Sequence, residues 1–370
     1  MNDALYIVDQ PALVDFCAGL GDPPWLALDT EFVREQTFHP QLCLIQIAVP
    51  GRVACIDPLA VPSLEPLLER LYDPRVTKVL HAAYQDLEIF FQLQGAVPAP
   101  VFDTQLAALV LGCGNQIGYA ALVERVLGVS LAKAHTRADW RRRPLAPEWL
   151  AYAADDVRYL GDLYNRQLAA LQERGWLEAL AEDFQALAAP EHYRLDPLDA
   201  WRRVRDQNRL RGAQQAVLRA LAAWRERQAS RQDRPRRWIL ADAALIELAR
   251  RLPDTPEALR QIRALPNAVR ERQGEALLEA IAAARAEPPE QWPTPSRRRR
   301  FSLEQAARAA RLVELLENRA AQYGIYPGAL ADRRDIEAVL FGEDSRLFHG
   351  WRAALLSGER LSEFAPDASG

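Results

Sequence analysis

The 370-residue sequence has few cysteines and no long hydrophobic run. Cys17, Cys43, Cys55 and Cys113 form no close pair, which argues against a zinc site and against a disulfide framework. No stretch reaches the roughly 18 apolar residues that a membrane-spanning helix needs. The acidic N-terminus also lacks the apolar core of a secretory signal. We therefore expect a cytoplasmic protein with no membrane contact.

Lysine is almost absent, because only Lys78 and Lys133 among the 46 basic residues are lysines. The formal net charge is −4, which by itself indicates no polyanionic partner. The charge is unevenly distributed, however: residues 200–300 contain 23 arginines and 12 acidic residues, an excess of 11 positive charges. This half could meet a phosphate backbone while the more acidic half holds metal.

The stretch Leu26 to Phe32 runs from three apolar residues into two acids one residue apart. Alternate side chains of a strand share a face, so Asp29 and Glu31 would point the same way. Two buried carboxylates need a positive partner, and a hard divalent cation with oxygen ligands is the natural one. The alternative is a strand end whose acids face water.

Residues 1 to about 190 alternate strand and helix signals. The predicted strands are 25–32, 43–49, 52–56, 77–81 and 101–103, with Pro50-Gly51 as a turn. Short connections between the first three favour an antiparallel meander, and helical segments at 84–94 and 104–111 favour parallel crossovers later. One long helix over 147–174, with Pro147 in its first turn, is expected to close the unit. The sequence predicts an α/β domain with a mixed sheet flanked by helices.

From about 195 onward the pattern is that of amphipathic helices. The expected helices are 212–229, 241–251, 256–264, 270–286, 302–322 and 332–340. The Pro-rich stretch 287–300 is predicted to be a linker. We therefore expect three domains: an α/β domain over 1–195, and two small all-α domains over 205–287 and 300–370.

Four further acids in the first half are informative: Asp86, Asp103, Asp155 and Asp156. Asp86 is predicted in the first turn of a helix, where a carboxylate suits either the helix dipole or a site. Asp103 ends a strand before Thr104, and a capping role is favoured. Tyr152 and Asp156 are four residues apart and share a helix face, whereas Asp155 is rotated away and is expected to face solvent.

Together these residues form Asp-x-Glu at a strand end, Asp at a helix start, and Tyr-x3-Asp on a later helix. Four converging carboxylates without metal would raise each other's pKa. They suit two divalent ions, Mg²⁺ or Mn²⁺, which clamp the attacking and leaving oxygens during phosphodiester hydrolysis. This chemistry is preferred over glycoside cleavage by carboxylates alone.

The pattern resembles the DEDD exonuclease superfamily, in the subclass with tyrosine in the third motif, and within it the ribonuclease D family. The matching segments are 28–35, 40–47, 81–87 and 152–160. The resemblance implies a ribonuclease-H-like fold, with Asp29, Glu31, Asp86 and Asp156 as metal ligands and Tyr152 orienting the attacking water. Residues beside these acids in the motifs, Thr30, Phe32 and His81, are the candidate substrate contacts.

A second resemblance covers residues 211–286, which are similar to an HRDC domain, the helical module of RecQ-type helicases. The matching segments include Leu221 to Arg225 and Pro235 to Asp242. One departure is visible, because Leu265-Pro266-Asn267 stands where a glycine-rich turn is usual. Residues 300–370 fit a second, diverged copy only loosely.

The arginines Arg141, Arg142 and Arg143 precede the predicted 147–174 helix. They could track a phosphate backbone near the acids, or they could form a solvated loop. The sequence leaves both readings open.

The resemblance implies a 3′→5′ exoribonuclease that releases 5′-monophosphates, with tRNA precursors carrying 3′ extensions as the expected substrate. A DNA 3′→5′ exonuclease remains an alternative, since the same acids serve both reactions. A non-catalytic RNA-binding scaffold is a second alternative, and the presence of all four acids and Tyr152 counts against it. No feature of the sequence indicates a protein partner.

Overall fold

The structure, a computed structural model, describes residues 4–131, 138–293 and 301–366. Its contacts divide the chain into two compact units. The first comprises residues 1–33, 42–193 and 301–370, and the second comprises residues 34–41 and 194–300. Arg297 to Arg300, in the predicted linker, and Lys133 lie outside the described residues.

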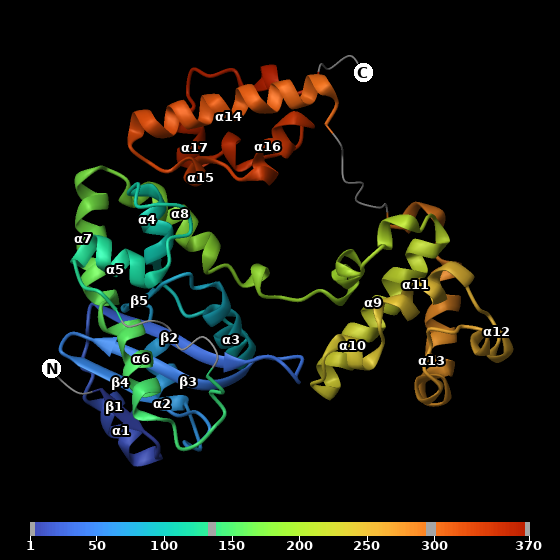
Figure 1. The fold of residues 1–370 in the computed structure, drawn as a ribbon, viewed down its shortest axis with the longest axis horizontal. Coiled ribbons are helices and arrows are strands. Elements are labelled where there is room, and N and C mark those ends of the chain that lie inside the picture. Colours follow the sequence, from blue (N-terminus) through green and yellow to red (C-terminus); the bar gives the residue numbers. More distant parts are fainter. Residues whose placement is uncertain (1–3, 132–137, 294–300, 367–370) are drawn as a thin grey trace. The chain divides into compact units, whose positions relative to one another are not determined.

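The first unit is built on a six-stranded mixed sheet with the order β1-β4-β3-β2-β5-β6 (Figure 1). The strands are β1 (Leu5–Ile7), β2 (Trp25–Val33), β3 (Gln41–Val49), β4 (Arg52–Ile56), β5 (Thr77–Leu80) and β6 (Val101–Asp103). β3 and β4 are antiparallel, whereas β2, β5 and β6 run parallel to one another. The predicted mixed sheet is confirmed, and β1, parallel to β4, is an addition that the sequence did not indicate.

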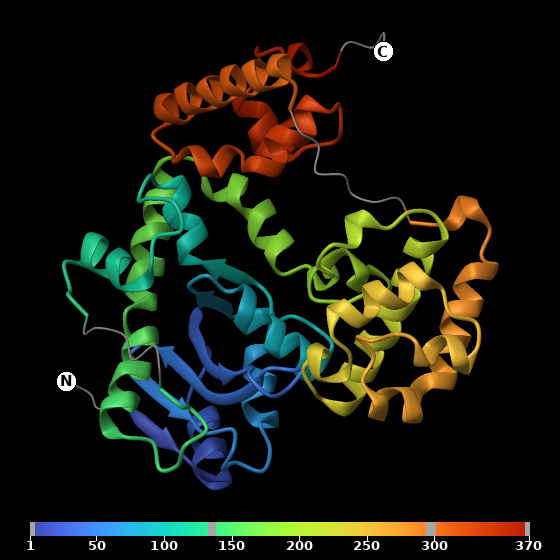
Figure 2. The same ribbon diagram turned by 45° about the vertical axis from the view of Figure 1, so that its right-hand side comes forward.

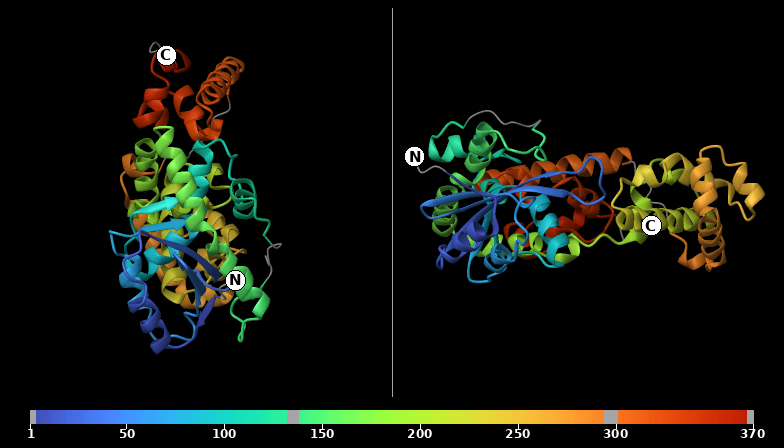
Figure 3. Two further views of the ribbon diagram at one scale, coloured as in Figure 1. Left: turned by 90° about the vertical axis from the view of Figure 1, so that its left-hand side faces the viewer. Right: turned by 90° about the horizontal axis from the view of Figure 1, so that it is seen from below.

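Helices cover both faces of this sheet, as the turned views in Figure 2 and Figure 3 show. The helices are α1 (Gln10–Ala18), α2 (Glu65–Leu71), α3 (Tyr84–Gln94), α4 (Thr104–Val110), α5 (Tyr119–Leu127), α6 (Pro147–Arg158), α7 (Leu160–Glu173) and α8 (Leu177–Leu187). Leu26 and Leu28 of β2 pack with α1, α2 and α3, whereas Trp25 and Ala27 pack with α4, α6, α7 and α8. The two-residue period of the strand therefore places Asp29 and Glu31 on the side that faces α6.

The predicted long helix over 147–174 is wrong in one respect, because the chain breaks at Tyr159 into α6 and α7. In a continuous helix the Tyr159 amide would donate to the Asp155 carbonyl. Here the Tyr119 hydroxyl donates to that carbonyl at 2.9 Å and accepts from the Tyr159 amide at 3.3 Å. A side chain inserted into the hydrogen-bond ladder is a recognised cause of such a break. At the start of α7, Gly161 has no room for a Cβ, which would lie 2.1 Å from the Trp25 ring.

The C-terminal helices belong to the first unit. They are α14 (Leu303–Tyr323), α15 (Pro327–Leu330), α16 (Arg333–Leu340) and α17 (Gly350–Leu355). α15 contacts α4, and α17 contacts α8, as Figure 1 shows. Leu312, Leu316 and Trp351 share one apolar cluster with residues of the sheet and of α8. Asp183 of α8 accepts from the Trp351 indole at 2.8 Å and from the Arg352 guanidinium at 2.9 Å.

The second unit is helical. It contains α9 (Ala213–Gln232), α10 (Arg236–Ile239), α11 (Asp242–Arg251), α12 (Pro256–Arg260) and α13 (Asn267–Ala286), with α9 packed against both α11 and α13. Its core gathers Leu218, Leu221, Leu245 and Leu277. At the predicted departure, Pro266 precedes α13 with an extended backbone, so the helix begins directly at Asn267.

The turn after β2 together with the first residue of β3, residues 34–41, also packs in the second unit. Phe38 is buried in its apolar core. The Asp233 carboxylate accepts from the backbone amides of Phe38 at 3.0 Å and His39 at 2.9 Å. Non-local packing of this kind has no signature in the local sequence pattern.

The predicted fold class is confirmed: a mixed sheet with flanking helices is joined to helical modules. The three-domain limits, and the description of 300–370 as a diverged second HRDC copy, stay predictions. By contacts alone, residues 301–366 pack with the sheet-containing unit, because apolar side chains of α14 and α17 complete its core.

Candidate active site

Three carboxylates meet where the end of β2 faces α6. One oxygen each from Asp29, Glu31 and Asp156 lie within 4.8 Å of one another. The strand period brings Asp29 and Glu31 to one face, and the helix turn brings Asp156 to the same point. Asp155 is directed elsewhere, and its carboxylate pairs with Arg158 at 2.8 Å.

The fourth acid, Asp86, joins the group from the other face of the sheet. Thr30 lies between the two β2 acids and points to the side of α3. Its hydroxyl donates to Asp86 in the first turn of α3, at an oxygen–oxygen distance of 2.5 Å. Asp86 is 7% exposed and influences the electrostatics of Asp29 and Glu31. Thr30, a candidate substrate contact, is therefore placed to hold an acid.

Burial raises the pKa of all four acids, and repulsion from the other acids of the cluster adds to this for Asp29 and Glu31. Burial, followed by the charges of Asp86, Asp156 and Glu31, raises the pKa of Asp29 well above its ordinary value. Burial and then Asp156 and Asp86 raise the pKa of Glu31 to about 8. Burial raises the pKa of Asp86 and that of Asp156 to about 7, although hydrogen bonds from Thr30 and Tyr152 oppose it. The ionised carboxylates are therefore unfavourable by themselves, and a bound cation would stabilise them.

Tyr152 lies one helical turn before Asp156 on α6, and its hydroxyl hydrogen-bonds to that carboxylate. The ring stacks on Trp140 with centroids 6.5 Å apart. Burial, together with the charges of Asp156, Glu31 and Asp29, raises the pKa of Tyr152 above its ordinary value. The phenol is thus a hydrogen-bond donor held at the edge of the acid cluster.

The other candidate substrate contacts differ in their surroundings. The ring of His81 is occupied by the fold, because Nδ1 lies 2.9 Å from the Thr104 hydroxyl and Nε2 lies 3.0 Å from the Ile117 carbonyl. Both nitrogens have protein partners, so this geometry favours a structural role over the expected contact with substrate. Phe32 is half-buried in β2, and its contact with substrate stays a prediction.

Asp103 fulfils the capping role expected of it. Its carboxylate accepts from the amides of Gln105 and Leu106 at the start of α4, and from those of Ala82 and Ala83 before α3. One acid therefore ties together the starts of two helices that follow neighbouring strands. It supports the position of Asp86 without joining the cluster.

Sequence reasoning missed two anchors of α6. Tyr119 ends the helix just after Asp156, and nothing in the local pattern singles it out. Arg143 holds the segment before α6, because its guanidinium pairs with the buried Asp57 at 2.5 and 2.8 Å and donates to the Cys43 carbonyl. The pKa of Asp57 is lowered by these hydrogen bonds, which overcome its burial. Neither open reading of the arginine cluster fits Arg143, which is an internal anchor.

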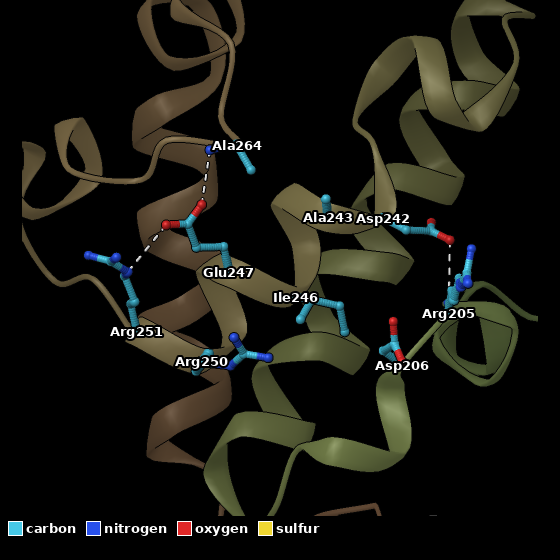
Figure 4. Close-up of a pocket in the computed structure, with 9 residues that line it drawn as sticks. All are labelled: Arg205, Asp206, Asp242, Ala243, Ile246, Glu247, Arg250, Arg251 and Ala264. Atoms are coloured by element: carbon cyan, nitrogen blue, oxygen red, sulfur yellow. Dashed lines mark hydrogen bonds and ion pairs between the residues drawn. The ribbon is translucent and has the colours of Figure 1, made fainter.

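A hollow of about 530 Å³ in the second unit does not have the character of this site (Figure 4). Its carboxylates already have partners: Glu247 accepts from the Ala264 amide and pairs with Arg251, and Asp242 pairs with Arg225 and accepts from the Arg205 amide. Its acids and arginines are mixed, with no converging carboxylates. The hollow therefore lacks the converging carboxylates that make the acid cluster of the first unit the candidate site.

The donor set fits a hard divalent cation. All groups in the cluster are carboxylate oxygens, the ligands that Mg²⁺ and Mn²⁺ prefer. Arg158, one turn after Asp155 on α6, pairs with Asp155 and leaves the cluster to oxygen ligands. Residues 5–171 match the sequence family described as 3′-5′ exonuclease, and residues 214–281 match the HRDC domain. Fold and site together define a metal-dependent 3′→5′ exonuclease.

Comparison with known proteins identifies the family within this class of exonucleases. The chain is 40% identical to Ribonuclease D of Acidiphilium cryptum over 366 residues, covering 97% of this chain and 92% of the relative. It is 45% identical over 291 residues to Ribonuclease D of Pseudomonas paraeruginosa, covering 78% and 76% of the two chains. The crystal structure of Escherichia coli RNase D, described as an exoribonuclease involved in structured RNA processing, matches with a TM-score of 0.85 at 31% identity over 98% of both chains. The chain belongs to the ribonuclease D family.

Family membership decides between the alternatives that the acids left open. The chain is a hydrolytic 3′→5′ exoribonuclease, it uses divalent metal, and its substrate is RNA. The DNA exonuclease and the non-catalytic scaffold are set aside. Within the described ranges, no helix is both long and apolar enough to cross a bilayer.

Proposed function

We propose that Asp29, Glu31, Asp86 and Asp156 hold two divalent cations, Mg²⁺ or Mn²⁺, and that this chain trims the 3′ ends of tRNA precursors in the cytoplasm. The product would be nucleoside 5′-monophosphates. The observation that carries the proposal is the meeting of three carboxylates within 4.8 Å at the end of β2, with Asp86 held beside them by Thr30. Two such cations, when bound, supply the positive charge that stabilises the attacking and leaving oxygens.

The residues of the chain have separate tasks in this proposal. The two β2 acids and Asp156 present oxygens from a strand and a helix, which fixes their spacing. On the face of the sheet opposite to these three acids, Thr30 donates to Asp86 and orients its carboxylate. The Tyr152 hydroxyl, hydrogen-bonded to Asp156, orients the attacking water.

The tRNA substrate is supported by the family and by the description of the Escherichia coli relative as a processor of structured RNA. The basic second unit of the present chain offers arginines for the phosphates of a folded RNA. No residue of the site itself distinguishes tRNA from other RNA.

The experiment is incubation of the purified full chain with a 3′-extended tRNA, with and without Mg²⁺ or Mn²⁺. We expect metal-dependent release of 5′-monophosphates. Asp29→Asn and Asp156→Asn remove a charge at nearly constant shape, and each should lower the rate by about a hundredfold or more. Asp155→Asn is the matched control on the same helix and should be mild.

Two results would refute parts of the proposal separately. Near wild-type cleavage by Asp29→Asn in Mg²⁺ would show that the ligands are wrongly assigned. Efficient cleavage of unstructured RNA with no trimming of 3′-extended tRNA would leave the ligands in place and exclude the tRNA role.

A further inference from the structure

The short helix α10 of the second unit carries an unusually exposed tryptophan. Trp238 is 55% exposed, although the next two residues, Ile239 and Leu240, are buried in the core of the unit. The guanidinium carbon of Arg234 lies 5.6 Å from the centre of one Trp238 ring. An exposed indole can stack on a flat ring, and neighbouring arginines can bind negative charge, so this surface suits a ligand with both features.

The backbone under Trp238 is held rigidly. Arg236 pairs with the buried Glu226 through two contacts of 2.5 and 2.7 Å, and it lies over the Phe38 ring at 4.4 Å. On the other side, the Arg225 guanidinium donates to the Leu240 carbonyl at 3.0 Å. The indole is therefore presented by a segment fixed at both ends, so little ordering is needed when a ligand binds.

The charge around Trp238 is positive and available. Arg227, Arg231, Arg234 and Arg237 are exposed, and in the described part of the chain none of them has an ion pair with a carboxylate. The acids within the same stretch are already used, because Glu226 pairs with Arg236 and Asp233 accepts the amides of Phe38 and His39. Four unpaired arginines within twelve residues attract a polyanion.

We propose that Trp238 is a stacking platform for a base of single-stranded RNA, with Arg231, Arg234 and Arg237 binding the neighbouring phosphates. Every base has a π-face, so stacking on an indole is independent of sequence. An exonuclease that removes successive nucleotides of any identity needs this kind of grip. The proposal uses the RNA specificity of the family and is independent of which residues bind metal.

The test is binding of a fluorescein-labelled single-stranded RNA to the full-length chain in EDTA, where the RNA stays intact. Trp238→Ala should weaken binding by about 5- to 160-fold, which corresponds to the roughly 1–3 kcal/mol lost with one stacked base. The dependence of the affinity on salt should stay unchanged, because no charge is lost. Trp238→Phe, which keeps an aromatic face, should retain most of the affinity.

The arginines should behave in the opposite manner. Arg237→Gln should weaken binding and reduce the slope of log affinity against log salt by about 0.7, the value for one phosphate contact with a single strand. Arg272→Gln on α13, an exposed arginine outside the α10 segment, is the charge-matched control and should leave both the affinity and the slope unchanged.

Clear outcomes overturn the proposal. Binding by Trp238→Ala within twofold of wild type, with an unchanged melting temperature, removes the platform. A change in sedimentation of Trp238→Ala without a change in RNA affinity identifies a protein interface instead. An equal loss for Arg272→Gln and Arg237→Gln shows diffuse attraction rather than a site. If Trp238→Ala is poorly folded, Trp238→Phe and Arg237→Gln decide the matter by the same criteria.

Discussion

The Tyr119 hydroxyl lies 2.9 Å from the carbonyl oxygen of Asp155, in the place where the helix would otherwise bond to itself. The same hydroxyl accepts from the Tyr159 amide at 3.3 Å, and α6 ends at Arg158, two residues after Asp156. The Tyr119 ring packs edge-on against His81, with centroids 5.7 Å apart. Because His81 is itself bound to Thr104 and Ile117, this contact links the break in the helix to the loop after β5.

Tyr119→Phe should therefore disturb the position of Asp156 although the ring is kept. We expect kcat to fall by about tenfold or more, since small misplacements of reacting groups are costly. The KM for RNA should change little, and the concentration of Mn²⁺ giving half-maximal rate should rise. Steady-state kinetics over a metal titration measures all three.

Tyr326→Phe is the control for this effect, because Tyr326 is an exposed tyrosine at the start of α15. It should match wild type in rate and in metal dependence. A Tyr119→Phe enzyme with lower thermal stability but an unaltered kcat and metal requirement would show that the hydroxyl serves folding alone.

Tyr152→Phe should reduce turnover less than Asp29→Asn does. The substitution removes one hydroxyl that hydrogen-bonds to Asp156, whereas Asp29→Asn removes a charged oxygen from the cluster. Orientation of a water contributes less than the positive charge that the acids hold. Single-turnover rates and RNA affinity should be compared for the two variants. A loss for Tyr152→Phe as large as that for Asp29→Asn would reverse this ranking.

The four acids also predict how the metal-free chain responds to pH. Their pKa values lie above the ordinary ones, with Glu31 at about 8 and Asp86 and Asp156 at about 7. Between about pH 4 and pH 8 the folded chain thus holds more protons at these groups than the unfolded chain does. The free energy of unfolding then decreases as pH rises through this window, because deprotonation is opposed in the folded state.

A divalent cation should offset this loss, since it binds the deprotonated carboxylates. Mn²⁺ should therefore raise the melting temperature more at about pH 8 than at about pH 6. Differential scanning fluorimetry with and without EDTA measures the difference. Asp29→Asn should show a smaller metal-induced shift at the higher pH, and an equal shift at both pH values in wild type would contradict the prediction.

The C-terminal helices are expected to stabilise the first unit through Asp183. Its carboxylate lies 2.9 Å from the buried Arg352 guanidinium and 2.8 Å from the Trp351 indole nitrogen. Asp183→Ala leaves the Arg352 charge buried without a partner, which costs about 3–5 kcal/mol in comparable pairs. Asp162→Ala, at an exposed acid of α7, should be nearly neutral. Thermal and denaturant unfolding of the three proteins measures the difference.

A chain ending near Leu195 is predicted to be less stable than any of these variants. It would expose the apolar side chains of α4 and α8 that the C-terminal helices cover. We expect such a fragment to aggregate or to melt at a much lower temperature. A soluble fragment with wild-type stability and full activity on short RNA would show that these helices are dispensable to the catalytic fold.

Much of the site follows from local sequence. The two-residue period of β2 puts Asp29 and Glu31 on one face, and the four-residue spacing on α6 selects Asp156 over Asp155. These are properties of a backbone repeat, so they can be derived without knowing what lies opposite. The capping function of Asp103 was likewise evident from a strand that ends directly before a helix.

The tertiary structure alone decided what holds those side chains in place. Thr30 bonds to Asp86 from 56 positions away, and Tyr119 interrupts a helix 36 positions later in the chain. Arg143 pairs with Asp57, which lies 86 positions earlier in the chain. This contact makes Arg143 an internal anchor, although the sequence alone left it open as a surface arginine. Such pairings depend on how distant segments pack, and no local period encodes them. The acids proposed to bind metal could thus be picked out from the sequence, whereas the side chains that hold them in place became visible only in the folded chain.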